Sequence, residues 1–398
     1  MNLASKSKQI ARGLMGLTAA IAPWGLANNA FADKKFGDFS YDVKDSAVTI
    51  TGFRQEVGGP VVIPAKIEGK PVTKIGDYAF YYCRDVTEVT IPGGVTKIGM
   101  NAFSNCSKLK KIELPASLEK FGTDAFANTD LRSVKIPAGV ETISARAFVG
   151  CFRLNNVEIS NGVRVIESQA FGYCSRLETV SLPESISNVT TESFAEAYLK
   201  EISVAAGNRR YSSADGIIYT KDHSRLISCP AQKSGAVKIP EGVRRLDMKS
   251  FYGVRRMTSV KLPKGLLSIE ARAFDECNDL QEVNLPDGLT DIGHHAFVHT
   301  RLATVTIPAT VDRIGGYAFV YSRNIKNVYF KGDAPALMGG NVFDSTSLSG
   351  EAVEGLTIYF YEGSEGFTEP TWMGYNTVAI NPETPAANRL LFGSQWNE

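Results

Sequence analysis

Residues 109–126 read LKKIELPASLEKFGTDAF, and residues 280–297 read LQEVNLPDGLTDIGHHAF. Both stretches alternate apolar and polar residues, as in Ile112-Glu113-Leu114, which indicates a short strand with one buried face. The proline that follows, Pro115 or Pro286, ends the strand because it lacks a backbone donor. Both stretches end in Ala-Phe, a small residue followed by a large aromatic one.

Phenylalanine recurs at this position along most of the chain. The repeated residues are Phe80, Phe103, Phe126, Phe148, Phe171, Phe194, Phe251, Phe274, Phe297, Phe319 and Phe343. Eleven of the 21 phenylalanines therefore share a spacing of about 23 residues, which is the signature of a solenoid. One coil cannot bury its own faces, so each coil needs a neighbour.

Short alternating strands followed by proline recur in step with the phenylalanines. The strands expected from this pattern are Val89–Ile91, Ile112–Leu114, Val134–Ile136, Val180–Leu182, Val260–Leu262, Val283–Leu285 and Val305–Ile307. We expect a strand-rich α/β repeat solenoid with short parallel strands, in which a short helical turn carries Ala-Phe and the rings form a continuous spine.

The domain organisation follows from where the repeat holds. We expect an N-terminal hairpin cap at 33–60, the solenoid at 61–345, a C-terminal cap at 346–382 and a flexible tail at 383–398. The interval of 57 residues between Phe194 and Phe251 predicts an irregular coil at 205–234 that carries an inserted hairpin. Two shorter intervals each lose one residue after the phenylalanine, near Thr129 and Thr300, where a loop absorbs the deletion.

Residues 1–32 have the pattern of a secretory signal peptide. Basic residues precede the apolar stretch 13–26, and Ala30-Phe31-Ala32 predicts cleavage after Ala32. A short buried helix is the alternative. We therefore expect an exported protein, extracellular or at the cell surface, with no transmembrane span in the mature chain.

Charge excludes an electrostatically driven nucleic-acid partner. The chain has 43 basic and 42 acidic residues, for a net charge of +1. The expected mature chain loses three basic residues, so its net charge becomes 1 − 3 = −2. Neither value provides the basic surface that nucleic acid requires.

The unit L-x-x-V-x-I-P-x-x-V-x-x-I-G-x-x-A-F-x-x-C resembles the BspA-type leucine-rich repeat of bacterial surface proteins. The resemblance covers about residues 60–345 and rests most clearly on 109–126 and 280–297. Asp215-Gly216-Ile217-Ile218-Tyr219 is similar to an insertion often seen in that family. The resemblance implies a leucine-rich-repeat horseshoe and a surface-exposed or secreted role in adhesion and protein interaction. Some units depart from the pattern, since Ser193, Ser250 and Val342 replace the alanine.

The cysteines allow two interpretations. Five of them follow a ladder phenylalanine by three residues: Cys83, Cys106, Cys151, Cys174 and Cys277. Disulfides are one hypothesis for an exported protein. We favour a column of small buried side chains that satisfy backbone groups of the turns, since Thr129 replaces cysteine in one coil. Cys229 lies off this column and is the thiol that we would test for reactivity.

The histidines and carboxylates provide no recognised catalytic or metal site. His295 and His299 have an i, i+4 spacing that could bind a metal on a helix, but a solvated turn is the favoured interpretation. No nucleophile-elbow, P-loop or dinucleotide-binding motif is present. We expect no catalytic residues, no metal and no cofactor, and a hydrolase site near 215–229 remains a minor hypothesis.

The outward side chains of the expected strands form the candidate binding face. They are Glu88, Thr90, Lys111, Glu113, Ser133, Lys135, Asn156, Glu158, Thr179, Ser181, Ser259, Lys261, Glu282, Asn284, Thr304, Thr306, Asn327 and Tyr329. Tyr329 is the one aromatic anchor among them. A merely solvated sheet face is the competing interpretation.

These observations support two hypotheses about function. The first is a secreted or surface-located, non-enzymatic interaction and adhesion protein whose partner is a protein or glycan of a cell surface or extracellular matrix. The alternative is a structural or glycan-binding component of the cell envelope.

Overall fold

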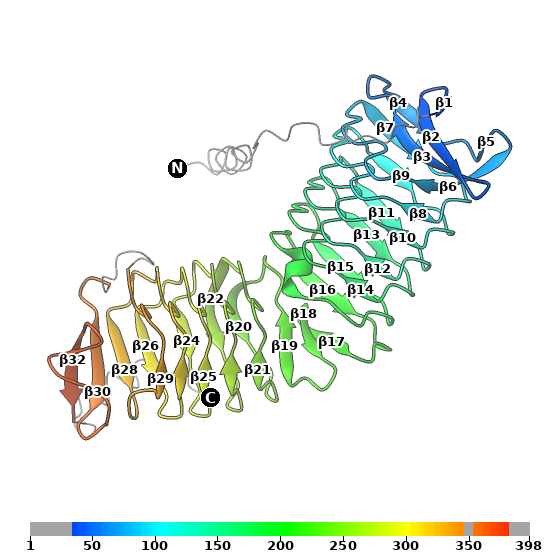
Figure 1. Cartoon of the computed structure of the whole chain (residues 1–398). Helices are drawn as coiled ribbons and strands as arrows, with labels where there is room; N and C mark the ends of the chain where they lie inside the picture. Colours follow the sequence, from blue (N-terminus) through cyan, green and yellow to red (C-terminus); the bar gives the residue numbers. More distant parts are fainter. Residues whose placement is uncertain (1–33, 346–352, 382–398) are drawn as a thin grey trace.

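The chain winds into a solenoid in which each regular coil contributes two strands. The computed structural model describes residues 34–345 and 353–381. The expected signal peptide, 1–32, and the expected tail, 383–398, lie outside the described residues. Figure 1 shows the coils stacked side by side in two arms that meet at a bend. The sequence-based prediction of a strand-rich repeat solenoid is confirmed.

Strands of the first series bear the candidate binding face. They are β4 (Gly59–Val62), β7 (Val86–Thr90), β9 (Lys111–Glu113), β11 (Ser133–Ile136), β13 (Asn156–Ile159), β15 (Thr179–Leu182), β16 (Glu201–Val204), β20 (Ser234–Lys238), β22 (Arg256–Lys261), β24 (Glu282–Asn284), β26 (Thr304–Ile307), β28 (Asn327–Phe330), β30 (Thr357–Tyr361) and β32 (Tyr375–Ile380). The strands that pair within this series run in parallel, as β11 does with β13, where Val134 lies opposite Val157.

A second series of mostly two-residue strands runs along another side of the coils. It consists of β6 (Lys70–Ile75), β8 (Lys97–Ile98), β10 (Lys120–Phe121), β12 (Thr142–Ile143), β14 (Val165–Ile166), β19 (Arg225–Ser228), β21 (Arg245–Leu246), β23 (Ser268–Ile269), β25 (Asp291–Ile292), β27 (Arg313–Ile314) and β29 (Leu337–Met338). A proline turn connects the two series, since Leu118 N donates to Pro115 O at 3.0 Å.

The repeated phenylalanines form the core of each arm. Phe103, Phe126 and Phe148 are fully buried. Neighbouring rings stack at 5.7 Å and 5.1 Å between centroids, with interplanar angles of 3° and 9°. This near-parallel stacking buries large aromatic surfaces between coils.

The segment that carries Ala-Phe differs from the expected helical turn. The residue before the alanine adopts a left-handed conformation, with φ of 54° at Asn101 and 55° at Asp124. The backbone N–H of Phe103 then donates to the carbonyl of Ala125 in the next coil, at 2.7 Å. A helix would direct that donor back along its own turn, whereas here it binds the neighbouring coil. Within the described residues the one helical segment is η2 (Thr191–Phe194), a 3₁₀ turn.

Both ends of the solenoid are covered by additional strands. At the N-terminus β1 (Lys34–Phe36), β2 (Phe39–Lys44) and β3 (Ala47–Phe53) pair antiparallel, and β3 continues in parallel to β6. β5 (Lys66–Ile67) also pairs with β6. At the C-terminus β30 and β32 extend the first series in parallel, and β31 (Thr371–Trp372) folds back on β32.

The bend lies at the irregular coil, coloured green in Figure 1. Here β17 (Tyr211–Ala214), β18 (Ile217–Thr220) and β19 form an antiparallel sheet, which confirms the expected inserted hairpin between β18 and β19. Cys229 N donates to Ser250 O at 2.7 Å, the bond that a ladder phenylalanine makes in regular coils. Cys229 therefore occupies the phenylalanine position, and the aromatic spine is interrupted between Phe194 and Phe251.

The inserted hairpin separates two hydrophobic cores. Ile218 and Ile227 pack with the N-terminal core, whereas Ile217, Tyr219 and Leu226 pack with the C-terminal core. Because strand side chains alternate between faces, one hairpin contributes to both cores. Each arm consequently has its own core.

Candidate functional site

The strand face consists of the outward side chains of the first strand series. In-register pairing places Glu88 opposite Lys111, Lys135 opposite Glu158, and Ser181 opposite Ser203. The side chains that are exposed are Thr90, Lys111, Glu113, Ser133, Lys135, Asn156, Glu158, Thr179, Ser181, Glu282 and Thr304. Those that are half-buried are Glu88, Lys261, Asn284, Thr306 and Asn327. The structure thus leaves most of the candidate residues accessible and aligns them opposite one another within each paired set of strands.

Charges on the strand face neutralise one another. Lys111 Nζ lies 2.7 Å from Glu88 Oε1 and 3.2 Å from Glu113 Oε1, and Lys135 pairs with Glu158. The hydrogen bond to Glu88 is the largest cause that raises the pKa of Lys111. Exposed pairs of this kind contribute little stability. Because opposite charges are paired, the face is polar and nearly neutral.

Two residues of the candidate face are buried, contrary to expectation. Tyr329 is 2% exposed because it lies directly opposite Tyr359 on β30, with ring centroids 4.8 Å apart. Ser259 is 8% exposed. Tyr329 therefore packs within the C-terminal arm and is not an accessible aromatic anchor. The repeat spacing did not reveal this, because the segment between Phe343 and β30 is longer than the corresponding segment of a regular coil.

A shallow hollow of about 250 Å³ lies on the strand face just before the bend. Its polar lining comes from β13, β15 and β16, and includes Asn156, Thr179, Glu201 and Ser203. Ser181 Oγ and Ser203 Oγ are 2.6 Å apart across two of these strands. Glu201 and Ser203 extend the candidate face by one strand that the sequence-based interpretation did not include.

The bend contains two cavities that sequence reasoning missed. One, of about 170 Å³, is lined partly by Phe194, Cys229 and Tyr252, and the other, of about 460 Å³, partly by Tyr211, Arg225 and Met248. Glu192 and Lys249 line both cavities and form an ion pair with each other. Hydrogen bonding from Lys249 is the main cause that lowers the pKa of Glu192, against an opposing effect of burial.

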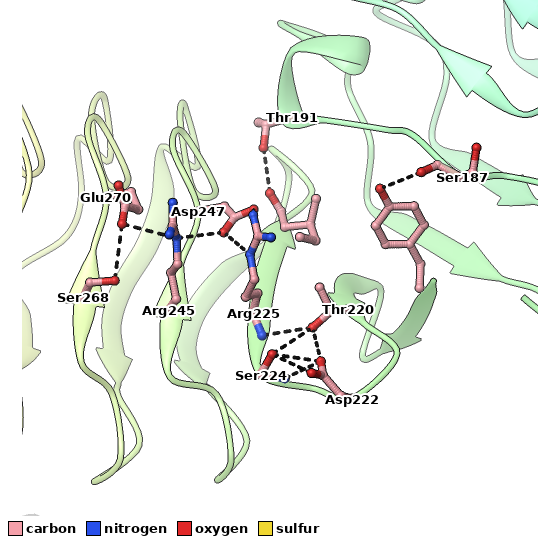
Figure 2. A network of polar contacts seen from close by, with 12 residues as sticks. Ser187, Thr191, Thr220, Asp222, Ser224, Arg225, Arg245, Asp247, Ser268 and Glu270 are labelled. Atoms are coloured by element: carbon pink, nitrogen blue, oxygen red, sulfur yellow. Dashed lines mark hydrogen bonds and ion pairs between the residues drawn. The ribbon is translucent and has the colours of Figure 1, made fainter. Parts of the chain in front are cut away.

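Alternating charges lie at the larger cavity at the bend: Arg225, Arg245 and Asp247 line it, and Glu270 pairs with Arg245. Figure 2 shows the four side chains in the order Glu270, Arg245, Asp247 and Arg225, on or just after the neighbouring strands β23, β21 and β19. Arg225 binds Asp247 through two hydrogen bonds of 2.9 Å and 2.6 Å, and Arg245 lies 3.2 Å from Glu270. These contacts join β19, β21 and β23. Both carboxylates, Asp247 and Glu270, are paired with an arginine.

The inserted coil contains the segment of the minor hydrolase hypothesis, residues 215–229, and Ser212 lies just before it. Cys229 is buried, and burial raises its pKa far above the ordinary thiol value, so the protonated form prevails. Burial therefore argues against a reactive thiol at Cys229. Ser212 Oγ lies 3.1 Å from His223 Nε2, but this hydroxyl also donates to Thr220 O within the hairpin.

The ladder cysteines bind backbone carbonyls. All six cysteines of the described residues are free and buried. Cys106, Cys174 and Cys277 donate to the carbonyl of a ladder phenylalanine in the preceding coil, at 3.0 to 3.3 Å. This arrangement confirms the favoured interpretation, a column of small side chains that satisfy turn groups, over disulfides.

The histidine cluster lies on turns, not on a helix. His295 and His299 adopt φ of 57° and 58° and stack on Tyr317 and Tyr321 of the next coil. His299 Nδ1 lies 3.6 Å from Asp275 Oδ1. Over residues 34–345 and 353–381, no group of three or more His, Cys, Asp or Glu is arranged to hold a metal ion. The same ranges contain no helix that could cross a membrane.

Residues 73–206 and 233–354 match the family model described as the BspA type leucine rich repeat region, in six copies. The pneumococcal vaccine antigen PcpA has a similar structure, with 25% identity and a TM-score of 0.69 over 83% of this chain and 87% of that chain. A leucine-rich cell surface protein from Faecalibacterium prausnitzii matches with 26% identity and a TM-score of 0.63, over 84% and 96%. A leucine-rich repeat protein from Bacteroides ovatus shares the fold, with 22% identity and a TM-score of 0.54, over 88% and 100%. No curated protein matches the chain.

Proposed function

This chain belongs to the BspA-type leucine-rich repeat family, and from that membership we propose that it is an exported, non-enzymatic interaction protein that acts in adhesion at the cell surface. The names of two relatives support this location, since one is a vaccine antigen and the other a cell surface protein. The family fold is a scaffold whose extended surfaces bind partners.

The observation that carries the proposal is the strand face of the N-terminal arm. From β7 to β16 its outward side chains are polar and largely exposed, and they lie in register within the pairs β7–β9, β11–β13 and β15–β16. Its internal ion pairs offset most of the charge, so affinity comes from many short-range contacts over several coils. The face suits an extended protein segment of the extracellular matrix or of another cell.

A non-enzymatic role is supported by the chemistry of the inserted coil. Its thiol is buried, and its closest serine–histidine contact serves the hairpin. A substrate panel with an Asp215→Ala variant tests this part of the proposal. Turnover that the variant abolishes would contradict it.

Binding of purified protein to a panel of matrix proteins, measured by biolayer interferometry, tests the interaction role. A variant combining Lys111→Ala, Glu113→Ala and Lys135→Ala should raise Kd about tenfold, equivalent to about 1.4 kcal/mol. The matched control is Glu141→Ala with Arg164→Ala, which removes an exposed ion pair outside the strand face. Binding that none of these variants changes would exclude the strand face as the site.

Cell fractionation tests the surface location. We expect the protein on cells or in the medium, and accessible to an externally added protease. Retention with purified peptidoglycan, without any protein ligand, would instead favour a structural or glycan-binding role in the envelope.

A further inference from the structure

A groove of about 440 Å³ runs across four coils of the N-terminal arm, on the turns that follow the ladder phenylalanines. It lies apart from the strand face and is independent of the function proposed above. Two columns of residues line it. The first holds the residues two positions after each phenylalanine, Tyr82, Asn105, Asn128 and Gly150, and the second includes Arg84, Ser107, Asp130 and Phe152.

The shape of the groove follows from a deletion in the third of these coils. In regular coils, three residues separate the second residue after the phenylalanine from the leucine that follows. In this coil only Thr129 and Asp130 separate Asn128 from Leu131. The shortened turn lies in the middle of the groove, between Ser107 and Phe152. One missing residue thus lowers the surface locally, while the turns on either side keep their full length.

Aromatic rings stand at both ends of the groove. Tyr82 is 37% exposed and Phe152 is 54% exposed. They belong to coils three steps apart, which corresponds to roughly 14 Å at the usual strand spacing. Tyr82 is held in place by Tyr81, with ring centroids 4.5 Å apart, and by Arg84, whose guanidinium lies 4.8 Å from the ring. Exposed aromatic rings at fixed positions in a hollow are typical of ligand sites.

Amide groups form the floor between the two rings. Asn128 Nδ2 donates to Asn105 Oδ1 at 3.2 Å, and each amide keeps a second N–H for a ligand. Asn105 and Asn128 share a left-handed backbone, with φ of 63° and 56°, so their side chains project in the same way. Gly150 makes room for them, because a Cβ there would lie 2.2 Å from Asn128 Oδ1.

Charge in the groove is unbalanced in favour of an anion. Arg153 Nε lies 3.4 Å from Asp130 Oδ1, which neutralises both. In the part of the chain that the structure describes, Arg84 contacts the Tyr82 ring and no carboxylate. A carboxylate on a ligand stacked near Tyr82 would give Arg84 the partner that the protein lacks.

We propose that the groove between Tyr82 and Phe152 binds a short acidic oligosaccharide. Tyr82 and Phe152 stack on the apolar faces of sugar rings, Asn105 and Asn128 bind hydroxyl or acetamide groups, and Arg84 binds a uronate carboxylate. Flat apolar faces combined with outward polar groups are the property of sugars that matches rings at the ends and amides between them.

Isothermal titration calorimetry with a hyaluronan tetrasaccharide, which alternates glucuronate and N-acetylglucosamine, tests the site in the whole protein. Chitotetraose, built only from N-acetylglucosamine, is the uncharged probe of equal length. Tyr82→Ala and Phe152→Ala should each weaken hyaluronan binding about tenfold, the effect of one lost stacking contact. Arg84→Met should abolish the preference for hyaluronan over chitotetraose. Ser107→Trp should block both probes without removing any proposed contact.

The other arm provides matched controls. Tyr321 and Arg323 occupy the same positions after Phe319 that Tyr82 and Arg84 occupy after Phe80. Tyr321→Ala and Arg323→Met should leave binding unchanged. Failure of the folded protein to bind either sugar, or loss of binding in the controls alone, would overturn the proposal. Equal binding of both sugars that Arg84→Met leaves intact would overturn the assignment of an acidic ligand.

Loss of matrix-protein binding in the groove variants, with no sugar binding, would also overturn the proposal, since the groove would then serve a protein. The strand-face variants distinguish this sugar site from the protein-binding function proposed above. They should alter matrix-protein binding and leave tetrasaccharide binding unchanged, so either idea can fail without the other.

Discussion

Cys106 Sγ donates to the backbone carbonyl of Phe80, one coil earlier, at 3.0 Å. Ser322 makes the same bond to the carbonyl of Phe297, at 2.7 Å. The position therefore requires a small donor and not a thiol as such. At this position a side chain of one coil donates to the backbone of the preceding coil and so joins the two.

Replacement of Cys106 by serine should preserve stability, whereas replacement by alanine should not. Cys106→Ala removes a buried donor and should lower the free energy of unfolding by about 1–3 kcal/mol. Cys106→Ser restores the donor and should remain within about 1 kcal/mol of the unmodified protein. Urea denaturation measures both, and equal losses in the two variants would show that the hydrogen bond is unimportant.

The ladder thiols should resist alkylation in the folded protein. Burial raises the pKa of Cys151 to about 11 and that of Cys83 to about 12. Maleimide should leave the native protein unmodified at pH 7 and label its cysteines in denaturant. The pKa of Cys151 is higher in the folded protein than in the unfolded chain, so its protonated thiol favours the folded state. This stabilisation is complete below pH 9.0 and declines as the pH rises toward 11. Rapid native labelling would contradict the buried column.

Gly122 should tolerate no side chain, in contrast to Gly93. A Cβ on Gly122 would lie 2.5 Å from the backbone nitrogen of Met100 in the preceding coil, whereas one on Gly93 would meet nothing within 4 Å. Gly122→Ala should cost about 1–3 kcal/mol because the coils must move apart. Thermal unfolding compares this variant with Gly93→Ala as the control, and similar melting temperatures for the two would refute the close approach.

The Glu192–Lys249 ion pair should stabilise the bend only above acidic pH. Lys249 lowers the pKa of Glu192 below its ordinary value of 4.5, so the pair stabilises the fold above that pH and loses its effect as the pH falls. Lys249→Met should cost about 1 kcal/mol or less at pH 7, since both side chains are partly exposed, and progressively less as the pH falls below 4.5. Lys108→Met, which removes an exposed pair with Asp85, is the control. A pH-independent cost measured by urea denaturation would rule out this linkage.

The two arms should respond separately to core mutations. Phe126→Ala should destabilise its own arm by about 3–5 kcal/mol because it leaves a cavity in the ring stack. Hydrogen exchange should rise in the coils before the bend and stay unchanged in β22–β28. Phe274→Ala should produce the opposite pattern. A uniform increase along the chain in both variants would show that the cores behave as one.

The repeat architecture could be predicted from the sequence because it depends on spacing alone. Alternation with a period of two predicts strands, and phenylalanines every 22–24 residues predict stacked coils, as for Phe103 and Phe126. The strands of both caps and of the inserted hairpin could be predicted from the same alternation of apolar and polar residues. The helical turn was wrong because the backbone N–H of the phenylalanine donates to the next coil, a contact that no local pattern reveals.

What the sequence by itself determined is therefore the coil, its buried ladder and the columns of the strand face. Only the tertiary structure decided which positions are accessible and which are joined. Tyr329 and Cys229 are buried by strands distant in sequence, the hairpin divides one expected core into two, and Tyr82 and Phe152 border one groove across a shortened turn. The physical reason is that spacing defines each coil's own conformation, whereas burial, cavities and charge balance depend on neighbouring coils.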